Sequence, residues 1–471
     1  MHQRLRPAMW LASLMAIGVM AGLETSGAQQ AQKPAAKPPV QRDAKKPTPA
    51  KPSAPAASAA APAPSGQPWL RWGGPTLDFI VPSTGLANSW PADGPPRLWS
   101  RTLGDGYSGI SEENGILYTG YRSGKEDVIT ALDEQSGKTI WETKYSAPFT
   151  NSWADGVGPG PYAMPQVIGD RIVAASGTGL IHSLDKKTGK IVWKHDLYAE
   201  FGGTELGFGY SSHPLPYKDT LIVLVGGGGI LSRMTGGGGA IMAFKQRDGA
   251  IAWKANSFTN AHSSPMLINV NGQQQVVALL AAEVMGFDPN NGTMLWRHPH
   301  PTGNGLAISQ PVWGPDNILF VSSAYGTGSR ALELRQANGQ TTVRELWASP
   351  RIMSHFGTVI RRGDYVYLSS GHSGPAFMTA VNVKTGQIAW QQRGFSKAQL
   401  LYADGKFVMI DEDGTLALAT ATPQNFSVLA QTPLLKRIAW TPPTLVGTRL
   451  YVRDRNTIVA LDLGATKSAM R

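Results

Sequence analysis

The chain has 471 residues and a formal net charge of +11, with 54 glycines, no cysteine and 16% charged residues. Because there is no cysteine, the chain can have no disulfide, no thiolate metal ligand and no lipid-bearing cysteine. Residues 1–68 hold eight basic and two acidic residues and the rest hold 35 and 30, so the remaining chain carries only +5. This small excess does not favour a nucleic-acid partner.

An export signal is predicted at residues 1–28. Arg4 and Arg6 precede an apolar run over residues 8–23, and residues 26–28 are small, as a cleavage site requires. The run of about 16 residues is shorter than the roughly 20 that a helix needs to cross a bilayer. We therefore expect an exported protein, in the periplasm or cell envelope of a bacterium, with no transmembrane span in the mature chain. An uncleaved N-terminal membrane anchor is the alternative.

Two further segments precede the main body of the chain. Residues 29–68 contain ten prolines and twelve alanines with interspersed lysines, so they cannot bury a core and are predicted to be a disordered linker. Such a linker is either a solubilising spacer or a basic tether to anionic envelope polymers. Residues 69–95 contain Trp69, Trp72, Phe79 and Trp90, which is too aromatic for a linker. They are predicted to form an N-terminal strap packed on one face or edge of the fold.

A single motif then recurs along the chain. Each clear copy has an alternating β-branched run, a polar turn with glycine and a second run ending in tryptophan, which predicts a β-hairpin. The copies are 128–141 (VITALDEQSGKTIW), 181–193 (IHSLDKKTGKIVW), 241–253 (IMAFKQRDGAIAW), 284–296 (VMGFDPNNGTMLW) and 378–390 (MTAVNVKTGQIAW). The mean period of about 50 residues fits one four-stranded propeller blade per repeat.

Weaker copies complete a set of eight. Residues 331–347 form one with a longer turn, and residues 416–429 form another in which Leu429 stands in for the tryptophan. Residues 96–99 (PRLW) have only the second half of the motif, and residues 458–462 (IVALD) have only the first half. The sequence therefore predicts an all-β, eight-bladed β-propeller over residues 96–464, with the last blade closed by both termini, and a tail over 465–471.

The repeat A-x-D-x-x-T-G-x-x-x-W resembles that of the PQQ-like (quinoprotein-like) β-propeller family, from about Trp69 to Gly464. This family includes BamB-type assembly proteins and PQQ-dependent alcohol dehydrogenases. The resemblance implies the fold and leaves the function open. It also implies, for the enzymes, a vicinal cysteine pair, a Ca²⁺ site built from Glu, Asn and Asp, and an aspartate base. The cysteine pair is absent here, and no motif matches the Ca²⁺ ligands.

The repeated tryptophans are predicted to be structural. They are Trp99, Trp141, Trp193, Trp253, Trp296, Trp347 and Trp390. Equivalent placement in successive blades indicates that each docks one blade on its neighbour and buries a large aromatic area.

A second series of residues is predicted to surround a central funnel, because it comes just before the innermost strand of each blade, where loops converge. The candidate binding residues are Tyr107, Tyr162, Glu205, His213, Ser264, Gln310, His355, Lys397 and Trp440. His262 and His372 are further imidazoles near this ring. No His-x-x-x-His or cysteine spacing supports a metal site, and no catalytic residue is identified. The glycine runs 226–229 and 236–239 lack the Lys-Ser/Thr pair of a phosphate-binding loop.

The sequence favours a cell-envelope scaffold that binds other envelope proteins and needs no cofactor. Two alternatives remain. One is a PQQ- and Ca²⁺-dependent oxidoreductase, and the other is a binder of a small polar or saccharide ligand in the funnel. Aromatic side chains facing the funnel would favour the ligand binder over the scaffold.

Overall fold

The computed structural model describes residues 66–150, 154, 156–227, 239–372 and 374–465. The predicted signal segment, the linker up to residue 65, residues 228–238 with parts of both glycine runs, and residues 466–471 of the tail lie outside the described residues. Within the described ranges, no helix is both long enough and apolar enough to cross a membrane.

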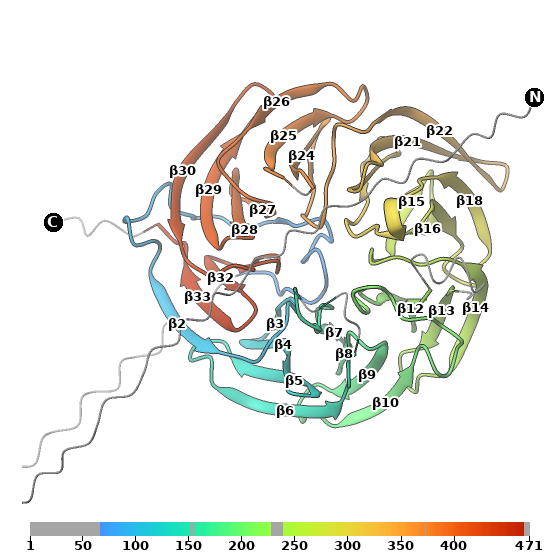
Figure 1. The fold of residues 1–471 in the computed structure, drawn as a ribbon, viewed down its shortest axis with the longest axis horizontal. Coiled ribbons are helices and arrows are strands. Elements are labelled where there is room, and N and C mark those ends of the chain that lie inside the picture. The colour runs from blue at the N-terminus through green and yellow to red at the C-terminus, as the bar shows by residue number, and fades with distance from the viewer. Residues whose placement is uncertain (1–65, 151–153, 155, 228–238, 373, 466–471) are drawn as a thin grey trace, which may run out of the picture. The chain divides into compact units, whose positions relative to one another are not determined.

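Seven blades each contain four antiparallel strands that follow one another in sequence from the centre outward, and one of these blades has a fifth strand (Figure 1). The first three consist of β3 (Ser111–Glu113), β4 (Ile116–Ser123), β5 (Glu126–Asp133) and β6 (Thr139–Ser146); β7 (Gln166–Ile168), β8 (Arg171–Ala175), β9 (Leu180–Asp185) and β10 (Ile191–Asp196); and β11 (Leu215–Tyr217), β12 (Thr220–Val225), β13 (Gly239–Lys245) and β14 (Ile251–Phe258).

The next four blades repeat this arrangement. They consist of β15 (Met266–Val270), β16 (Gln273–Leu279), β17 (Glu283–Phe287) and β18 (Met294–Pro299); β19 (Val312–Trp313), β20 (Ile318–Ser323), β21 (Gly328–Ala337) and β22 (Gln340–Ser349); β23 (Ile360–Arg362), β24 (Tyr365–Ser370), β25 (Phe377–Asn382) and β26 (Ile388–Gln392); and β27 (Ala398–Ala403), β28 (Lys406–Asp411), β29 (Thr415–Ala421) and β30 (Phe426–Pro433). A short 3-10 turn, η2 (Gly303–Gly305), follows β18.

The eighth blade combines strands that are far apart in sequence. Its inner strands are β31 (Thr444–Val446), β32 (Arg449–Arg453) and β33 (Thr457–Asp462), and its outermost strand is β2 (Arg97–Thr102). Trp99 lies opposite Ala460 in the antiparallel β2–β33 register. The predicted eight-bladed, all-β fold is confirmed.

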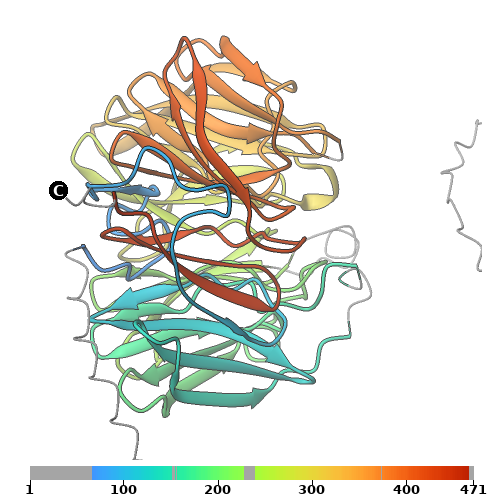
Figure 2. The same cartoon turned by 90° about the vertical axis from the view of Figure 1, so that its left-hand side faces the viewer.

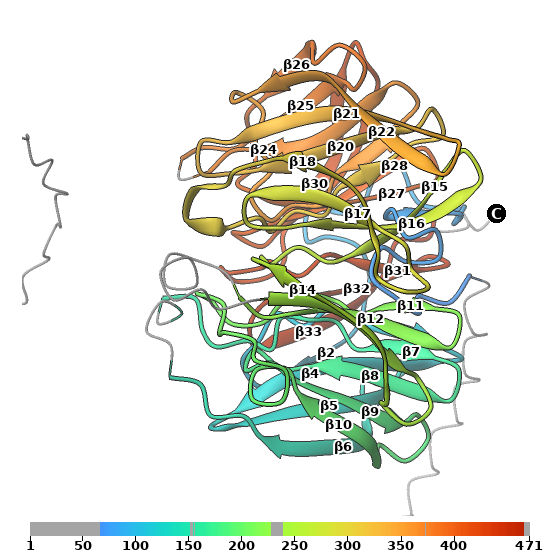
Figure 3. The same cartoon turned by 90° about the vertical axis from the view of Figure 1, so that its right-hand side faces the viewer.

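Residues 69–86 lie across one face of the ring, drawn blue in Figures 2 and 3, with η2 on the opposite face. Trp69 forms a bridge with Glu112 and is only 1% exposed, and β1 (Ile80–Val81) adds to β27 as a fifth, parallel strand. The backbone N–H of Val167 donates to the carbonyl of Leu70. This segment, here named the strap, therefore binds the inner strands of several blades.

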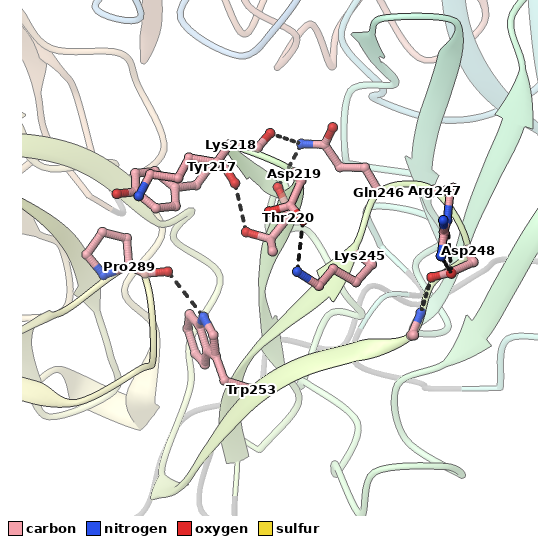
Figure 4. A network of polar contacts seen from close by, with 11 residues as sticks. Tyr217, Lys218, Asp219, Thr220, Lys245, Gln246, Arg247, Asp248, Trp253 and Pro289 are labelled. Carbon is pink, nitrogen blue, oxygen red and sulfur yellow. Dashed lines mark hydrogen bonds and ion pairs between the residues drawn. The ribbon is translucent and has the colours of Figure 1, made fainter.

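Six of the repeated tryptophans make the same contact with the following blade. Each indole N–H donates to a carbonyl oxygen in the turn of that blade, at 2.7–3.1 Å; the pairs are Trp99–Glu134, Trp141–Lys186, Trp193–Gln246, Trp253–Pro289, Trp347–Val383 and Trp390–Thr422. Figure 4 shows the Trp253 contact. Trp296 instead donates to the side chain of Gln275 in its own blade.

The turn glycine of the repeat is required at this contact. Gly249 has φ +75°, and a Cβ added there would lie 2.9 Å from the ring of Trp193. A larger residue would therefore meet both an unfavourable backbone conformation and the docked indole. This explains why the motif pairs a glycine in each turn with a tryptophan in the preceding blade.

The prediction that Leu429 replaces the tryptophan is wrong by one residue. In β5–β6, Ala131 lies opposite Trp141 and Leu132 opposite Thr139, so the residue before the tryptophan is bulged out of the register. In β29–β30, Leu418 lies opposite Ala430 and Ala419 opposite Val428. The position of the tryptophan is therefore taken by Ala430, and Leu429 is the bulged residue, because a bulge adds one residue to the outer strand.

Candidate functional site

A cavity of about 300 Å³ opens where the blade-to-blade connections converge on the face opposite the strap. Most of its lining residues lie between the outermost strand of one blade and the innermost strand of the next. The lining consists of Trp72, Tyr107, Val157, Tyr162, Phe208, Gly209, Ser211, His213, His262, Ser264, Ile308, Gln310, Tyr325, His355, Phe356, Gln399, Trp440 and Pro442. We call this cavity the funnel.

The funnel brings together seven of the nine residues predicted for it. They are Tyr107, Tyr162, His213, Ser264, Gln310, His355 and Trp440. Lys397 lies behind this lining, where its Nζ is 2.7 Å from Glu412 Oε1 and 5.8 Å from the centre of the Phe356 ring. Glu205 is exposed and is not among the lining residues.

Several lining residues were not predicted. Trp72 comes from the strap, and Tyr325 comes from the β20–β21 connection rather than from a segment before an inner strand. Phe356 directly follows the predicted His355, so its position in the series was available from the sequence. Nothing in the local sequence of Trp72 signals that it lies under the centre of the ring.

Aromatic rings form one wall of the funnel. Tyr107 is stacked between Tyr162, with ring centres 5.6 Å apart, and Trp440, with ring centres 5.2 Å apart. Trp440 also contacts Phe356, with ring centres 4.9 Å apart. This row presents a large apolar area, as in many small-molecule sites.

Three imidazoles in the lining are uncharged at neutral pH. Burial lowers the pKa of His213 to about 3 and that of His262 to about 4. Burial, with smaller effects of Lys397 and His372, lowers the pKa of His355 to about 4. Because a protonated imidazole has no compensating anion there, the neutral form is favoured. These rings can therefore serve as hydrogen-bonding groups but not as cations.

Two of these imidazoles each have one nitrogen without a partner. Ser264 Oγ accepts from the backbone N–H of His213 and lies 2.8 Å from its Nδ1, where the hydroxyl can either donate or accept. The hydroxyl of Tyr325 lies 2.7 Å from His355 Nε2 and can likewise either donate or accept. Within the described part of the chain, His213 Nε2 and His355 Nδ1 have no hydrogen-bond partner.

The strap lines the funnel from the other side. The ring of Trp72 stacks on His213 with centres 4.0 Å apart and planes 22° apart. Trp72 also lines a second cavity of about 300 Å³, which lies between the strap and the inner strands and includes Arg71, Asp78 and Phe79. Trp72 therefore lies between the funnel and this second cavity.

The described lining does not fit a Ca²⁺–quinone pair. It contains no aspartate, glutamate, lysine or arginine, whereas Ca²⁺ prefers carboxylate and carbonyl oxygens and an anionic quinone needs a cation. No cluster of three or more His, Asp or Glu side chains suited to a metal occurs among the described residues.

A family model described as outer membrane protein assembly factor BamB matches residues 124–392, more than half of the chain. The chain belongs to this family. The resemblance that the repeats predicted is therefore confirmed.

Relatives extend the match over most of the propeller. Outer membrane protein assembly factor BamB of Moranella endobia is 21% identical over 399 residues, covering 82% of each chain, and that of Bordetella pertussis is 23% identical, covering 74% of this chain and 85% of its own. A 1-butanol dehydrogenase (quinone) of Thauera butanivorans is 28% identical over only 137 residues, 28% of this chain and 20% of its own.

Solved structures of a BamB protein and of a quinohemoprotein alcohol dehydrogenase both share the fold. BamB from Moraxella catarrhalis has a TM-score of 0.54 at 17% identity and matches over 78% of this chain and 100% of its own. Quinohemoprotein alcohol dehydrogenase from Comamonas testosteroni has a TM-score of 0.60 at 13% identity, over 86% of this chain and 82% of its own. At such identities the likeness extends to the fold alone.

Proposed function

We propose that the protein is an exported scaffold of the bacterial cell envelope, which binds protein partners during assembly of outer-membrane proteins. The observation that carries this proposal is the extent of the matches. Relatives described as outer membrane protein assembly factors align over 74–82% of this chain, whereas the curated quinone enzyme aligns over 28%.

The rim of the propeller offers surfaces suited to protein partners. The outermost strand of each blade has one edge without a partner strand in the described sheets, and such edges can pair with an added strand. Exposed large apolar side chains also recur on the outermost strands of six blades: Leu98, Ile140, Val192, Ile251, Met294 and Val428. One exposed apolar side chain per blade is ordinary for a protein surface, so the unpaired strand edges carry this argument.

Loss of the gene in the bacterium that encodes this protein should lower the amount of folded barrel proteins in the outer membrane. The measurement is the heat-modifiable fraction of these proteins on semi-native gels. The full chain should restore that fraction. So should an Ile308→Asp variant, which leaves the rim of the propeller unchanged. An unchanged fraction after loss of the gene would contradict the assembly role.

The second candidate is a quinone-dependent oxidoreductase, which the likeness to quinone alcohol dehydrogenases favours. Oxidation of an alcohol requires a base to take the substrate proton and a cation to polarise the quinone oxygen. The described funnel lining holds neither a carboxylate base nor a carboxylate ligand for the cation.

We therefore expect no turnover when the purified protein is supplied with PQQ, Ca²⁺, an alcohol or sugar and an artificial electron acceptor. The control is the same mixture without protein. Turnover above that control, abolished by Glu205→Gln or by substitution of another carboxylate near the funnel, would support the enzyme instead of the scaffold.

A further inference from the structure

The funnel has the dimensions of a small-molecule site and is not used by the proposed scaffold role. Its volume of about 300 Å³ lies at the lower end of the range of ligand pockets. Trp72 lines it on the strap side, and we expect a ligand to enter from the face where the blade-to-blade connections converge. Ten lining residues carry aromatic or imidazole rings, and each of these rings contacts at least one other.

The charge of the lining restricts the ligand. The described lining residues include no acidic or basic side chain, and the three imidazoles are neutral. Two ion pairs lie behind the wall: Lys397 with Glu412, and Arg455 with Asp105 at 2.7 Å. An anion or cation in the funnel would lose its water without gaining a counter-ion, which is costly. The ligand is therefore uncharged.

The polar atoms restrict it further. Trp72 Nε1, His213 Nε2 and His355 Nδ1 are ring nitrogens of the lining that have no hydrogen-bond partner in the described structure. The indole nitrogen is always a donor, and a buried donor that lacks an acceptor costs free energy. A ligand with a carbonyl or ether oxygen that reaches Trp72 would supply that acceptor. The row Tyr162–Tyr107–Trp440 provides the apolar wall for its ring system.

We infer that the funnel is a binding site for an uncharged, mainly apolar ring compound that carries a hydrogen-bond acceptor. This class excludes an anionic quinone such as PQQ, because the described lining offers no counter-ion for a charged ligand. It also differs from a neutral saccharide, whose many hydroxyl groups would leave most of their hydrogen bonds unmade against this wall.

A matched pair of fluorescent probes tests the inference. Prodan (6-propionyl-2-dimethylaminonaphthalene) is uncharged and has a flat ring system with one carbonyl acceptor. In 6-dimethylamino-2-naphthalenesulfonate, a sulfonate replaces the propionyl group on the same rings. We expect blue-shifted, saturable emission of prodan with one site per chain. We expect binding of the sulfonate to be at least about tenfold weaker, as desolvation of an unpaired charge requires.

Variants at Ile308 locate the site. Ile308 is half-buried and lines both the funnel and the cavity under the strap. Ile308→Asp places a charge in the lining and should weaken prodan binding about tenfold or more. Ile308→Asn introduces a side chain of the same shape as aspartate but without its charge, and should weaken prodan binding much less. Ile140→Asp makes the same change at a 49% exposed position on the outer strand β6 and should leave binding unchanged.

Thermal unfolding of each variant separates loss of the site from loss of the fold. The inference is overturned if folded protein shows no saturable prodan binding, or if the sulfonate binds as well as prodan. It is also overturned if folded Ile308→Asp binds prodan normally. Displacement of prodan by maltose would assign the funnel to saccharides instead. Because Ile308→Asp leaves the rim intact, failure here and failure of the scaffold role are distinguishable.

Discussion

Deletion of residues 456–471 should unfold the whole propeller rather than one blade. The deletion removes β33, the strand between β32 and β2 in the closing blade. Ile458, Val459, Ala460 and Leu461 of this strand are at most 1% exposed. Burial of each larger aliphatic side chain contributes about 1.5–3 kcal/mol, and β2 would also lose its only partner strand in that sheet. The combined loss is of the order of the entire stability of a typical domain, about 5–15 kcal/mol.

Thermal unfolding followed by circular dichroism measures the effect. A variant that ends at residue 465 retains every described strand and serves as the control, and it should melt at the temperature of the full chain. If the chain lacking residues 456–471 melts at the same temperature as the full chain, closure through β2 and β33 does not hold the ring together.

Trp193→Ala should destabilise the protein by about 3–5 kcal/mol, as for other buried aromatic residues replaced by alanine. Trp193 is 8% exposed, its indole N–H donates to Gln246 of the next blade at 3.0 Å, and its ring lies against Gly249. Alanine removes the ring that fills this contact and leaves the carbonyl of Gln246 without its donor.

Trp193→Phe is the matched control, because it retains an aromatic ring and loses the hydrogen bond. It should cost about 1–2 kcal/mol. Denaturant unfolding gives both values. Prodan binding at low denaturant should be unchanged in either variant, since Trp193 does not line the funnel. Loss of binding at unchanged stability would show that Trp193 belongs to a site rather than to the blade contact.

The propeller could be predicted from the sequence because the residues that form the turns and strands of each blade lie close together in the chain. The turn from Asp185 to Gly189 is closed by short-range hydrogen bonds, from Gly189 N–H to the Asp185 carbonyl and from Thr188 to the Asp185 side chain. The tryptophan then docks on the next copy of the same turn. Eight similar units that each need a neighbour form a closed ring. The register around Leu429 was not predictable, because a bulge is decided by pairing with β29.

The residues of the funnel were only partly predictable. Tyr107, Tyr162 and Trp440 precede inner strands, so the repeat places them near the centre. The partner of Lys397 is Glu412, fifteen residues away, and the repeat does not indicate whether this lysine faces the cavity or the carboxylate. Trp72 belongs to a segment without a repeat, so its place beneath His213 follows only from how the strap crosses the ring.

The sequence by itself determined the architecture, because turn chemistry and apolar alternation act within a few residues and are repeated in every blade. It also determined that no cysteine could act on a quinone or carry a lipid. Only the tertiary structure decided the character of the funnel. Side chains from separate blades and the strap are brought together there, and their burial makes the imidazoles neutral while nearby charges pair behind the wall. Charge and hydrogen bonding in a cavity depend on such long-range neighbours, which a repeat with a period of about 50 residues does not encode.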